Sequence, residues 1–375
     1  MNKGIGLLLV AFLPILDLVF GQGTLFPAII TFGDSAHDVG NNNNRRTSFK
    51  ANFFPYGREF PNREATGRFS DGKIILDFTA ESLGFNSTPP AYLSPEASGQ
   101  NLRYGVSFAT AGTGYFEETS VANAAIPLPQ QLKNFQTYKE KLAKVVGMNQ
   151  SLSIVSEALF LLTAGNADFF QNYYFSSSTG KEYNLDSFTS VLLESFSSFA
   201  KVQLHCSIAP LHRPKWEPTT GCVQELYGLG ARRLGVTNLP PMGCLPAART
   251  LLKYRGVRSC NAKLNDDAEF FNGKLNATVN SLKRQLPGFK MVAFNIYEIL
   301  LDIATSPSKF GIKDGRRPCC QIERNGRRAS VLCARNFNKL CANSSAHVFF
   351  DAVHPSEAAN KAISDAMLTQ GFGLI

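Results

Sequence analysis

The sequence predicts an α/β fold in which a parallel β-sheet is covered by helices on both faces. Short apolar segments alternate along the chain with longer amphipathic ones, as in successive strand–helix–strand units. The chain has 375 residues, 44% hydrophobic and 18% charged, so it can bury a large core. It contains no Pro/Ser-rich linker and no internal repeat, which favours a single domain.

Five segments rich in apolar and β-branched residues are the candidate strands: residues 28–32, 158–163, 234–238, 291–296 and 347–350. Amphipathic stretches between them are the candidate helices: residues 71–83, 129–145, 186–199, 261–286 and 356–369. The carboxyl ends of parallel strands meet along one edge of the sheet, and open α/β sheets place their functional groups there.

The first residues, MNKGIGLLLVAFLPILDLVFGQG, have the pattern of a secretory signal peptide: a Lys, an apolar run and small residues at the end. We therefore expect residues 1–22 to be removed and residues 23–375 to form a secreted, extracellular domain. Pro14 and Asp17 interrupt the apolar run, and no later stretch is long and apolar enough to span a bilayer. The sequence therefore predicts no stable membrane anchor.

Residues 200–222, AKVQLHCSIAPLHRPKWEPTTGC, do not fit the alternation. This segment has three prolines and the only Trp of the chain. It interrupts what reads as one helix, which runs from residue 188 to residue 199 and continues over residues 223–229. It is either a surface loop closed by a Cys206–Cys222 disulfide or a stretch of doubtful origin, and both interpretations stay open.

Cysteine and sequon usage agrees with secretion. The chain has eight cysteines, an even number, and no Cys-x-x-Cys pair, so disulfides are expected and a zinc site is not. Cys319 and Cys320 are adjacent, which favours separate partners, and Cys244–Cys260 is expected from proximity. Four Asn-x-Ser/Thr sequons predict N-glycosylation: Asn86, Asn149, Asn276 and Asn343.

The formal net charge is +9, and the basic residues occur in short clusters without interleaved aromatic residues. This pattern is typical of a solvated surface, so we expect no nucleic-acid partner for a secreted protein. A weak attraction to an anionic extracellular matrix is the alternative.

Ser35 follows the first candidate strand, in the stretch ITFGDSAHDVGNNNN of residues 30–44. A serine hydroxyl is a poor nucleophile until a base removes its proton, and the base works best when a carboxylate fixes its tautomer. Ser35 therefore needs a histidine. The alternative is an ordinary strand-to-turn junction, because Gly, Asp, Ser and Asn all favour turns.

His354 is the best candidate for that base. In FFDAVHPSEAANK, Asp351 follows the last candidate strand and His354 comes three residues later. At this spacing a carboxylate can accept from Nδ1–H and leave Nε2 free. A capped helix start with an incidental histidine is the alternative. The other histidines are less suited, being next to Ser35, within segment 200–222 or inside a candidate strand: His37, His205, His212 and His347.

The stretches FGDSAHDVGNNN and FFDAVHPSEAANK resemble the first and last motif blocks of the plant GDSL-type esterase/lipase family, a branch of the SGNH hydrolases. The resemblance runs from about residue 27 to the end and includes GRFSDGK, GARRLGVTNLPPMGCLPA and the Cys-rich run before His354. It implies a single three-layer, flavodoxin-like α/β/α domain around a central parallel sheet. It also implies Ser35 as nucleophile, His354 as base, Asp351 as the carboxylate that orients it, and neither a metal nor an organic cofactor. Segment 200–222 is an insertion relative to this family.

The resemblance further implies an oxyanion hole. The second block, GVSFATAGTGY, implies the backbone N–H of Gly112 as one donor, with the N–H of Ser35 as another. Asp38, Gly40 and Asn41–Asn43 continue the first block. We expect these residues to shape the loop around Ser35, with substrate contact as the second interpretation.

The third block departs from the family pattern, which is Gly-x-Asn-Asp. In TAGNADFF, Gly165 and Asp168 match, but Ala167 stands at the position of the asparagine and Asn166 comes one residue early. Successive residues that leave a strand point to opposite sides. The sequence therefore predicts either a weak catalyst or a shifted loop that brings Asn166 into the oxyanion hole.

The sequence as a whole predicts a secreted serine esterase or lipase that hydrolyses carboxylic esters through an acyl-enzyme. Its expected partner is an ester of a small molecule, a lipid or a polysaccharide. Two alternatives stay open: an extracellular binding or defence-associated protein with little or no activity, and an acyltransferase that uses the same residues. The natural substrate and its acyl-chain length are not determined by the sequence.

Overall fold

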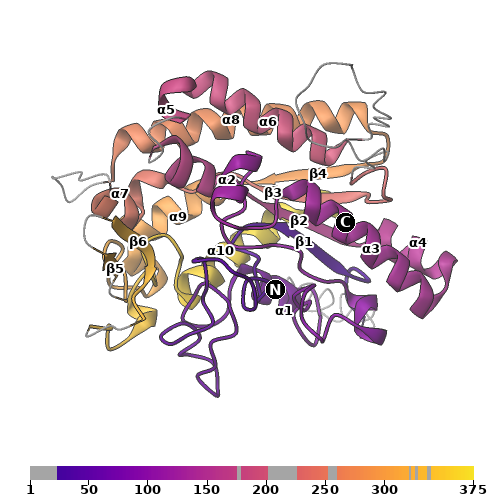
Figure 1. Cartoon of the computed structure of the whole chain (residues 1–375), viewed down its shortest axis with the longest axis horizontal. Coiled ribbons are helices and arrows are strands. Elements are labelled where there is room, and N and C mark those ends of the chain that lie inside the picture. The colour runs from indigo at the N-terminus through magenta and orange to yellow at the C-terminus, as the bar shows by residue number, and fades with distance from the viewer. Residues whose placement is uncertain are drawn as a thin grey trace, which may run out of the picture.

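The computed structural model describes residues 23–174, 179–201, 226–251, 260–320, 322–325, 328–335 and 339–375. Its centre is a parallel sheet of four strands in the order β1-β2-β3-β4 (Figure 1). The strands are β1 (Ile29–Gly33), β2 (Leu159–Thr163), β3 (Arg233–Thr237) and β4 (Lys290–Phe294). Every residue of β1 and β2 is buried, as expected for a parallel sheet that is covered on both faces.

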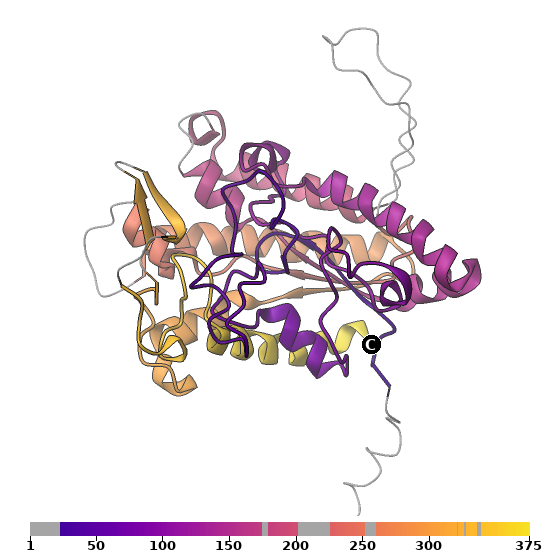
Figure 2. The same ribbon diagram turned by 60° about the horizontal axis from the view of Figure 1, so that its bottom comes forward.

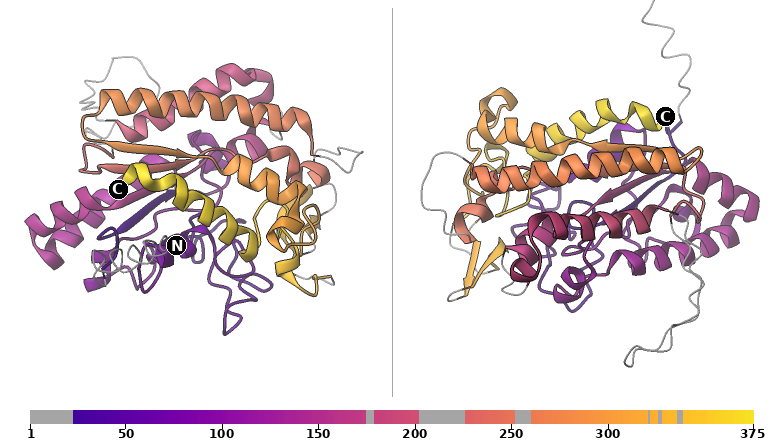
Figure 3. Two further views of the ribbon diagram at one scale, coloured as in Figure 1. Left: turned by 180° about the vertical axis from the view of Figure 1, so that it is seen from behind. Right: turned by 90° about the horizontal axis from the view of Figure 1, so that it is seen from above.

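Helices cover both faces of this sheet, which makes the predicted three-layer α/β/α fold (Figures 2 and 3). One layer contains α3 (Leu128–Val146), α6 (Leu185–Ala200) and α8 (Ala262–Gln285). The other contains α1 (Ile75–Ser82), α9 (Ile296–Thr305) and α10 (Glu357–Gln370). Shorter helices flank these layers: α2 (Glu117–Ala122), α4 (Met148–Glu157), α5 (Thr179–Glu182) and α7 (Pro246–Leu251).

The element predictions are confirmed with one exception. Each of the five candidate helices and the first four candidate strands overlaps an observed element. The strand predicted at residues 347–350 is wrong. This segment is extended and buried, but its backbone pairs with loops and not with β4: the N–H groups of Cys319 and Cys320 donate to the carbonyls of Phe349 and Phe350. Apolar periodicity reports burial, and it cannot tell which backbone will supply the hydrogen bonds.

A segment that was not predicted as a strand extends the sheet beyond β1. Residues 106–110 run parallel to β1, where Phe108 N–H donates to the Thr31 carbonyl at 2.8 Å and Thr110 N–H to the Gly33 carbonyl at 2.9 Å. β1 therefore lies between this segment and β2. Three neighbouring chain segments consequently end at the same edge of the sheet as Ser35.

A disulfide-linked region lies at one end of the molecule, around the antiparallel hairpin of β5 (Ile322–Asn325) and β6 (Arg328–Cys333) (Figure 1). Cys319 pairs with Cys341 and Cys320 with Cys333, so the adjacent cysteines have separate partners as predicted. The expected Cys244–Cys260 disulfide is also present. Cys206 and Cys222 lie outside the described residues.

Most of segment 200–222 also lies outside the described residues, but the residues on either side of it are hydrogen-bonded to each other. The N–H of Leu226 donates to the Phe199 carbonyl at 3.1 Å, and the N–H of Tyr227 donates to the Ala200 carbonyl at 3.3 Å. The carboxyl end of α6 is therefore hydrogen-bonded directly to the chain that follows the insertion.

Candidate active site

Ser35 lies just beyond the carboxyl end of β1, where the chain turns away from the sheet. Gly33 has a φ of +110°, and a Cβ atom on it would lie 1.7 Å from the Thr163 carbonyl oxygen, so only glycine fits here. The buried side-chain amide of Gln131 on α3 makes two hydrogen bonds to Gly33. It accepts from Gly33 N–H at 2.8 Å and donates to the Gly33 carbonyl at 3.1 Å. The strand end that presents Ser35 is thus fixed from both sides.

Asp351 and His354 lie in a tight turn after the extended segment 347–350. The turn is closed by a hydrogen bond from Phe350 N–H to the His354 carbonyl at 2.8 Å. Inside it, Asp351 Oδ1 accepts from the N–H groups of Val353 at 2.9 Å and His354 at 2.8 Å. The Asp-x-x-His spacing therefore fixes the carboxylate beneath the imidazole.

The structure brings Ser35, His354 and Asp351 together. His354 Nδ1 lies 2.7 Å from Asp351 Oδ2, and His354 Nε2 lies 2.7 Å from Ser35 Oγ. Asp351 is fully buried, and the imidazole packs against the ring of Phe69 with centroids 4.9 Å apart. In this arrangement the imidazole can take a proton from the serine hydroxyl while the carboxylate stabilises the imidazolium.

A small cavity of about 30 Å³ adjoins Ser35 and His354, and Gly112, Asn166 and Ala167 also line it. In the part of the chain that the structure describes, neither Ser35 N–H nor Gly112 N–H donates to a protein acceptor. Two free N–H groups beside a serine hydroxyl are the arrangement that stabilises a developing oxyanion.

Asn166 and Ala167 thus both reach the cavity beside Ser35, and Asn166 Oδ1 is buried without a partner. Asp168 does not line this cavity, and its carboxylate accepts from the N–H groups of Tyr115 at 2.7 Å and Phe116 at 3.2 Å. Burial raises the pKa of Asp168 to about 7. The third block therefore braces the loop that follows Gly112 as well as lining the cavity.

The asparagine run holds the oxyanion-side loop in place. Asn41 Nδ2 donates to the carbonyls of Ser107 and Ala109, and Asn42 Nδ2 donates to the carbonyl of Ala111. Asp38 Oδ2 accepts from Ala111 N–H at 2.9 Å, and burial raises the pKa of Asp38 to about 6. These buried side chains bond to backbone, which supports the structural interpretation of the run.

The other two described histidines, His37 and His347, do not contact Ser35. His37 is fully buried, both of its ring nitrogens lack a hydrogen-bond partner, and burial lowers its pKa to about 4. His347 Nδ1 lies 3.0 Å from the Arg317 carbonyl. His205 and His212 lie outside the described residues.

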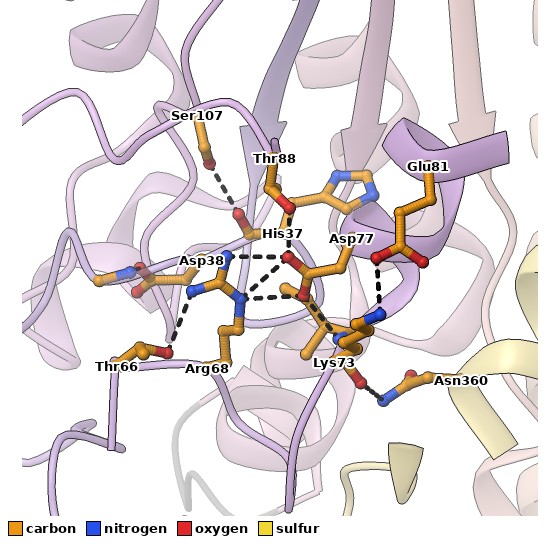
Figure 4. Close-up of polar contacts among 12 residues, drawn as sticks. His37, Asp38, Thr66, Arg68, Lys73, Asp77, Glu81, Thr88, Ser107 and Asn360 are labelled. Carbon is orange, nitrogen blue, oxygen red and sulfur yellow. Dashed lines mark hydrogen bonds and ion pairs between the residues drawn. The ribbon is translucent and has the colours of Figure 1, made fainter. Parts of the chain in front are cut away.

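The GRFSDGK block, residues 67–73, contacts His354 through Phe69 and also bonds to α1 and to the amino end of α10. The guanidinium of Arg68 bonds both carboxylate oxygens of Asp77 at the start of α1, and Thr88 donates to the same carboxylate (Figure 4). Asp71 Oδ1 accepts from the N–H of Glu357 at 2.7 Å, which secures the amino end of α10 just after His354.

Two supporting residues were not identified from the sequence. Asp34 is buried, its Oδ1 accepts from Thr163 Oγ1 at 2.8 Å, and burial raises its pKa. Tyr56 is fully buried and donates to Asp351 Oδ2 at 2.7 Å. Asp34 adjoins Ser35 in the sequence and could have been found from that position, whereas Tyr56 lies 295 residues from its partner and no local pattern signals it.

The four sequon asparagines are exposed: Asn86, Asn149, Asn276 and Asn343. Within the described ranges, no helix has the length and apolar character needed to cross a bilayer, and no group of three or more His, Cys, Asp or Glu side chains could hold a metal ion.

Comparison of the sequence with known proteins shows which family the chain belongs to. Residues 29–367 match the GDSL-like lipase/acylhydrolase family. GDSL esterase/lipase APG from Arabidopsis thaliana is 45% identical over 369 residues, which cover 98% of this chain and 97% of that protein. GDSL esterase/lipase At5g22810 from the same plant is 44% identical, covering 94% of this chain and 91% of that protein.

Among solved structures, the lipase Lip_vut3 from a goat rumen metagenome matches with a TM-score of 0.37 and 11% identity, covering 92% of this chain and 98% of that chain. A match at this level carries no argument about function. The family match, in contrast, spans most of the sequence and includes Ser35, Gly112, Asp351 and His354. The chain belongs to the GDSL-like lipase/acylhydrolase family.

Proposed function

We propose that this protein is a secreted serine esterase that cleaves carboxylic esters through an acyl-enzyme. Ser35 Oγ attacks the ester carbonyl while His354 Nε2 takes its proton, and Asp351 orients and stabilises the imidazolium. The N–H groups of Ser35 and Gly112 and the side chain of Asn166 stabilise the oxyanion. The tetrahedral intermediate collapses when the bond between the acyl carbon and the alkoxy oxygen breaks and His354 returns the proton to the departing alcohol, which leaves the acyl group on Ser35 Oγ. Water, deprotonated by the same imidazole, then releases the acid and restores the Ser35 hydroxyl.

The observation that carries this proposal is the continuous set of contacts from Asp351 Oδ2 through His354 to Ser35 Oγ, with two distances of 2.7 Å. Membership of a family of esterases and lipases supports an ester substrate. Secretion rests on the signal-peptide pattern of residues 1–22. Glycosylation of the four sequons rests on their exposure and remains part of the proposal.

The cavity beside Ser35 favours a small acyl group. Its volume is only about 30 Å³, and the bulky side chains of Phe49, Phe170 and Val353 line it. A methyl group fits such a space and a long acyl chain does not. We therefore expect hydrolysis of p-nitrophenyl acetate to exceed that of the butyrate, and the palmitate to be the poorest substrate.

The test is hydrolysis of these three esters by the wild type and by Ser35→Ala and His354→Ala. Both substitutions are expected to abolish turnover. His347→Ala is the matched control. It removes a histidine seven residues before His354 whose ring contacts the Arg317 carbonyl and not Ser35, so turnover is expected to be unchanged. Labelling by a fluorophosphonate probe that requires Ser35 would support an activated serine. Wild-type activity in Ser35→Ala, or no hydrolysis and no labelling in the wild type, would overturn the proposal.

A further inference from the structure

The carboxylate of Asp351 has a partner that the Ser–His–Asp set does not include. Tyr56 Oη lies 2.7 Å from Asp351 Oδ2, the same oxygen that faces His354 Nδ1. With the two backbone N–H groups on Oδ1, the carboxylate has four donors. Tyr56 and Asp351 are both fully buried, so water does not compete for these positions.

The direction of the Tyr56 hydrogen bond is fixed by its surroundings. Tyr56 Oη accepts from Cys333 N–H at 3.1 Å, so its single proton is free to point at Asp351. Burial and the charge of Asp351 raise the pKa of Tyr56 well above its usual value, which keeps the phenol protonated. The contacts therefore run from Cys333 N–H through the Tyr56 hydroxyl, Asp351 and His354 to Ser35.

The Tyr56 ring is itself held firmly. It packs against Phe53, Phe69 and Phe350, with centroids 5.3, 5.9 and 5.6 Å away. Phe69 also packs against the His354 imidazole, so one aromatic cluster contacts both the phenol and the base. A hydroxyl on a ring that cannot rotate away holds its acceptor at a fixed position.

From this geometry we infer that Tyr56 is a positioning residue of the active site, which holds Asp351 Oδ2 against His354 and withdraws electron density from that oxygen. The inference rests on the proposed function of Ser35, His354 and Asp351. Without the phenol, the carboxylate has one donor fewer and attracts the imidazolium proton more strongly. The orientation of the imidazole toward Ser35 is also less restricted.

The test is Tyr56→Phe, which removes only the hydroxyl. We expect kcat to fall about tenfold, the usual order for losing a hydrogen bond to a charged group, with KM nearly unchanged. We also expect the acid limb of the kcat/KM–pH profile to move to higher pH. Among the described residues, the ionisable groups that act on His354 are Asp351, which is hydrogen-bonded to it, and Asp34, whose charge is close to it. Tyr56 acts indirectly, through its hydrogen bond to Asp351. The substitution leaves the contacts of Asp34 unchanged and changes Asp351 only by removing the phenol donor.

Tyr138→Phe is the matched control. Tyr138 is also fully buried, and its hydroxyl donates to the Leu102 carbonyl at 2.6 Å, away from Ser35. This variant loses a comparable buried hydrogen bond, and we expect its kcat and pH profile to match the wild type. If Tyr56→Phe also keeps the wild-type kcat and acid limb, the inference is overturned.

A second variant covers the case in which Tyr56→Phe does not fold. Incorporation of 3-fluorotyrosine at position 56 keeps the ring and hydroxyl but makes the phenol a stronger donor, so the acid limb is expected to move to lower pH. An unmoved acid limb contradicts the inference.

The downfield ¹H NMR resonance of His354 Nδ1–H gives a readout that needs no substrate. It is expected to shift in both Tyr56 variants and to stay in place in Tyr138→Phe. Failure of the proposed function would appear separately, as a wild type that hydrolyses no ester. An unshifted resonance in the Tyr56 variants would overturn the positioning role even then.

Discussion

At the residue scale, Asn166 comes one position before the asparagine of the family pattern. It lines the cavity with Ser35 and Gly112, and its Oδ1 has no partner, so its amide is not committed to holding the fold. A loop that leaves a strand can present either of two neighbouring side chains to a cavity, depending on its path. Ala167 on its own therefore does not imply an inactive site.

We expect Asn166→Ala to lower kcat by about 10²–10³ and to change KM little, because an oxyanion donor acts in the transition state. Asn172→Ala is the matched control, since Asn172 lies in the following helical segment, Asp168–Tyr173, bonds Thr119 and does not line the cavity beside Ser35. Steady-state kinetics on p-nitrophenyl acetate measure both. An unchanged kcat in Asn166→Ala would leave the oxyanion to the two backbone N–H groups.

His37, two residues from Ser35, affects how the stability of the fold depends on pH. It is buried and neutral at pH 7, with a pKa of about 4 in the folded state against about 6.5 in the unfolded state. Between about pH 6.5 and pH 4, His37 is protonated in the unfolded chain but stays neutral in the folded chain. Stability is therefore lost as the pH falls from about 6.5 to about 4, and this histidine contributes no such loss above that range.

We expect the free energy of unfolding of the wild type to fall by about 2 kcal/mol more than that of His37→Leu between pH 7 and pH 5. Asp38 and Asp168 titrate in both proteins, so their effects cancel in the difference. Urea unfolding at the two pH values measures it. Parallel losses in the two proteins would show that His37 is not the neutral buried group described here.

At the scale of elements, one side chain of α3 connects the helix to the end of β1. Gln131 accepts from Gly33 N–H and donates to the carbonyls of Gly33 and Ile126. Gln131→Met keeps the length of the side chain but leaves a buried N–H unpaired, so we expect a loss of about 2–4 kcal/mol in unfolding free energy. Gln130→Met on the exposed side of the same helix is the control, expected within about 0.5 kcal/mol of the wild type. Equal stabilities, measured by urea unfolding, would contradict this role.

The two disulfides beside the turn of Asp351 offer a matched pair. Cys333 N–H donates to Tyr56, whereas Cys319 and Cys341 have no contact with that hydroxyl. Replacing either disulfide by two serines is expected to lower stability by about 2–5 kcal/mol. The kcat per folded molecule should fall further in Cys320→Ser/Cys333→Ser than in Cys319→Ser/Cys341→Ser. Circular dichroism gives the folded fraction by which kcat is normalised. Equal normalised kcat values in the two double variants would show that the Cys320–Cys333 disulfide has no particular effect on catalysis.

At the scale of the whole molecule, the two flanks of segment 200–222 are hydrogen-bonded to each other. Deleting residues 201–223 would turn the bonds Leu226 N–H to Phe199 and Tyr227 N–H to Ala200 into i→i+4 bonds of one α-helix. We expect the deletion variant to fold, with an unfolding temperature at or above that of the wild type and unchanged esterase kinetics.

Thermal unfolding and p-nitrophenyl acetate hydrolysis test this expectation. The same number of residues removed from within α8, residues 263–285, gives a control that should not fold, because α8 covers one face of the sheet. Loss of folding in the insertion deletion as well would show that residues 201–223 are an integral part of the domain.

The sequence by itself determined the layers of the fold and the residues of the central site. Strand-like apolar runs and amphipathic helices are local patterns, and a parallel sheet places the ends of its strands along one edge whatever the details of packing. The spacing of Asp351 and His354 is also local, since one tight turn accounts for it. Ser35, Asp351 and His354 could therefore be named as candidates from their surroundings in the sequence, and Gly112 only from the resemblance of its block to the GDSL family.

Only the tertiary structure decided which chain segments supply the remaining contacts. The segment 347–350 is as apolar as a strand, but the disulfide-linked region and not β4 provides its hydrogen bonds. Whether Asn166 reaches the cavity depends on the path of a loop, and Tyr56 meets Asp351 across 295 residues of sequence. Hydrogen bonds between distant segments depend on packing in three dimensions, and no local pattern of residues encodes them.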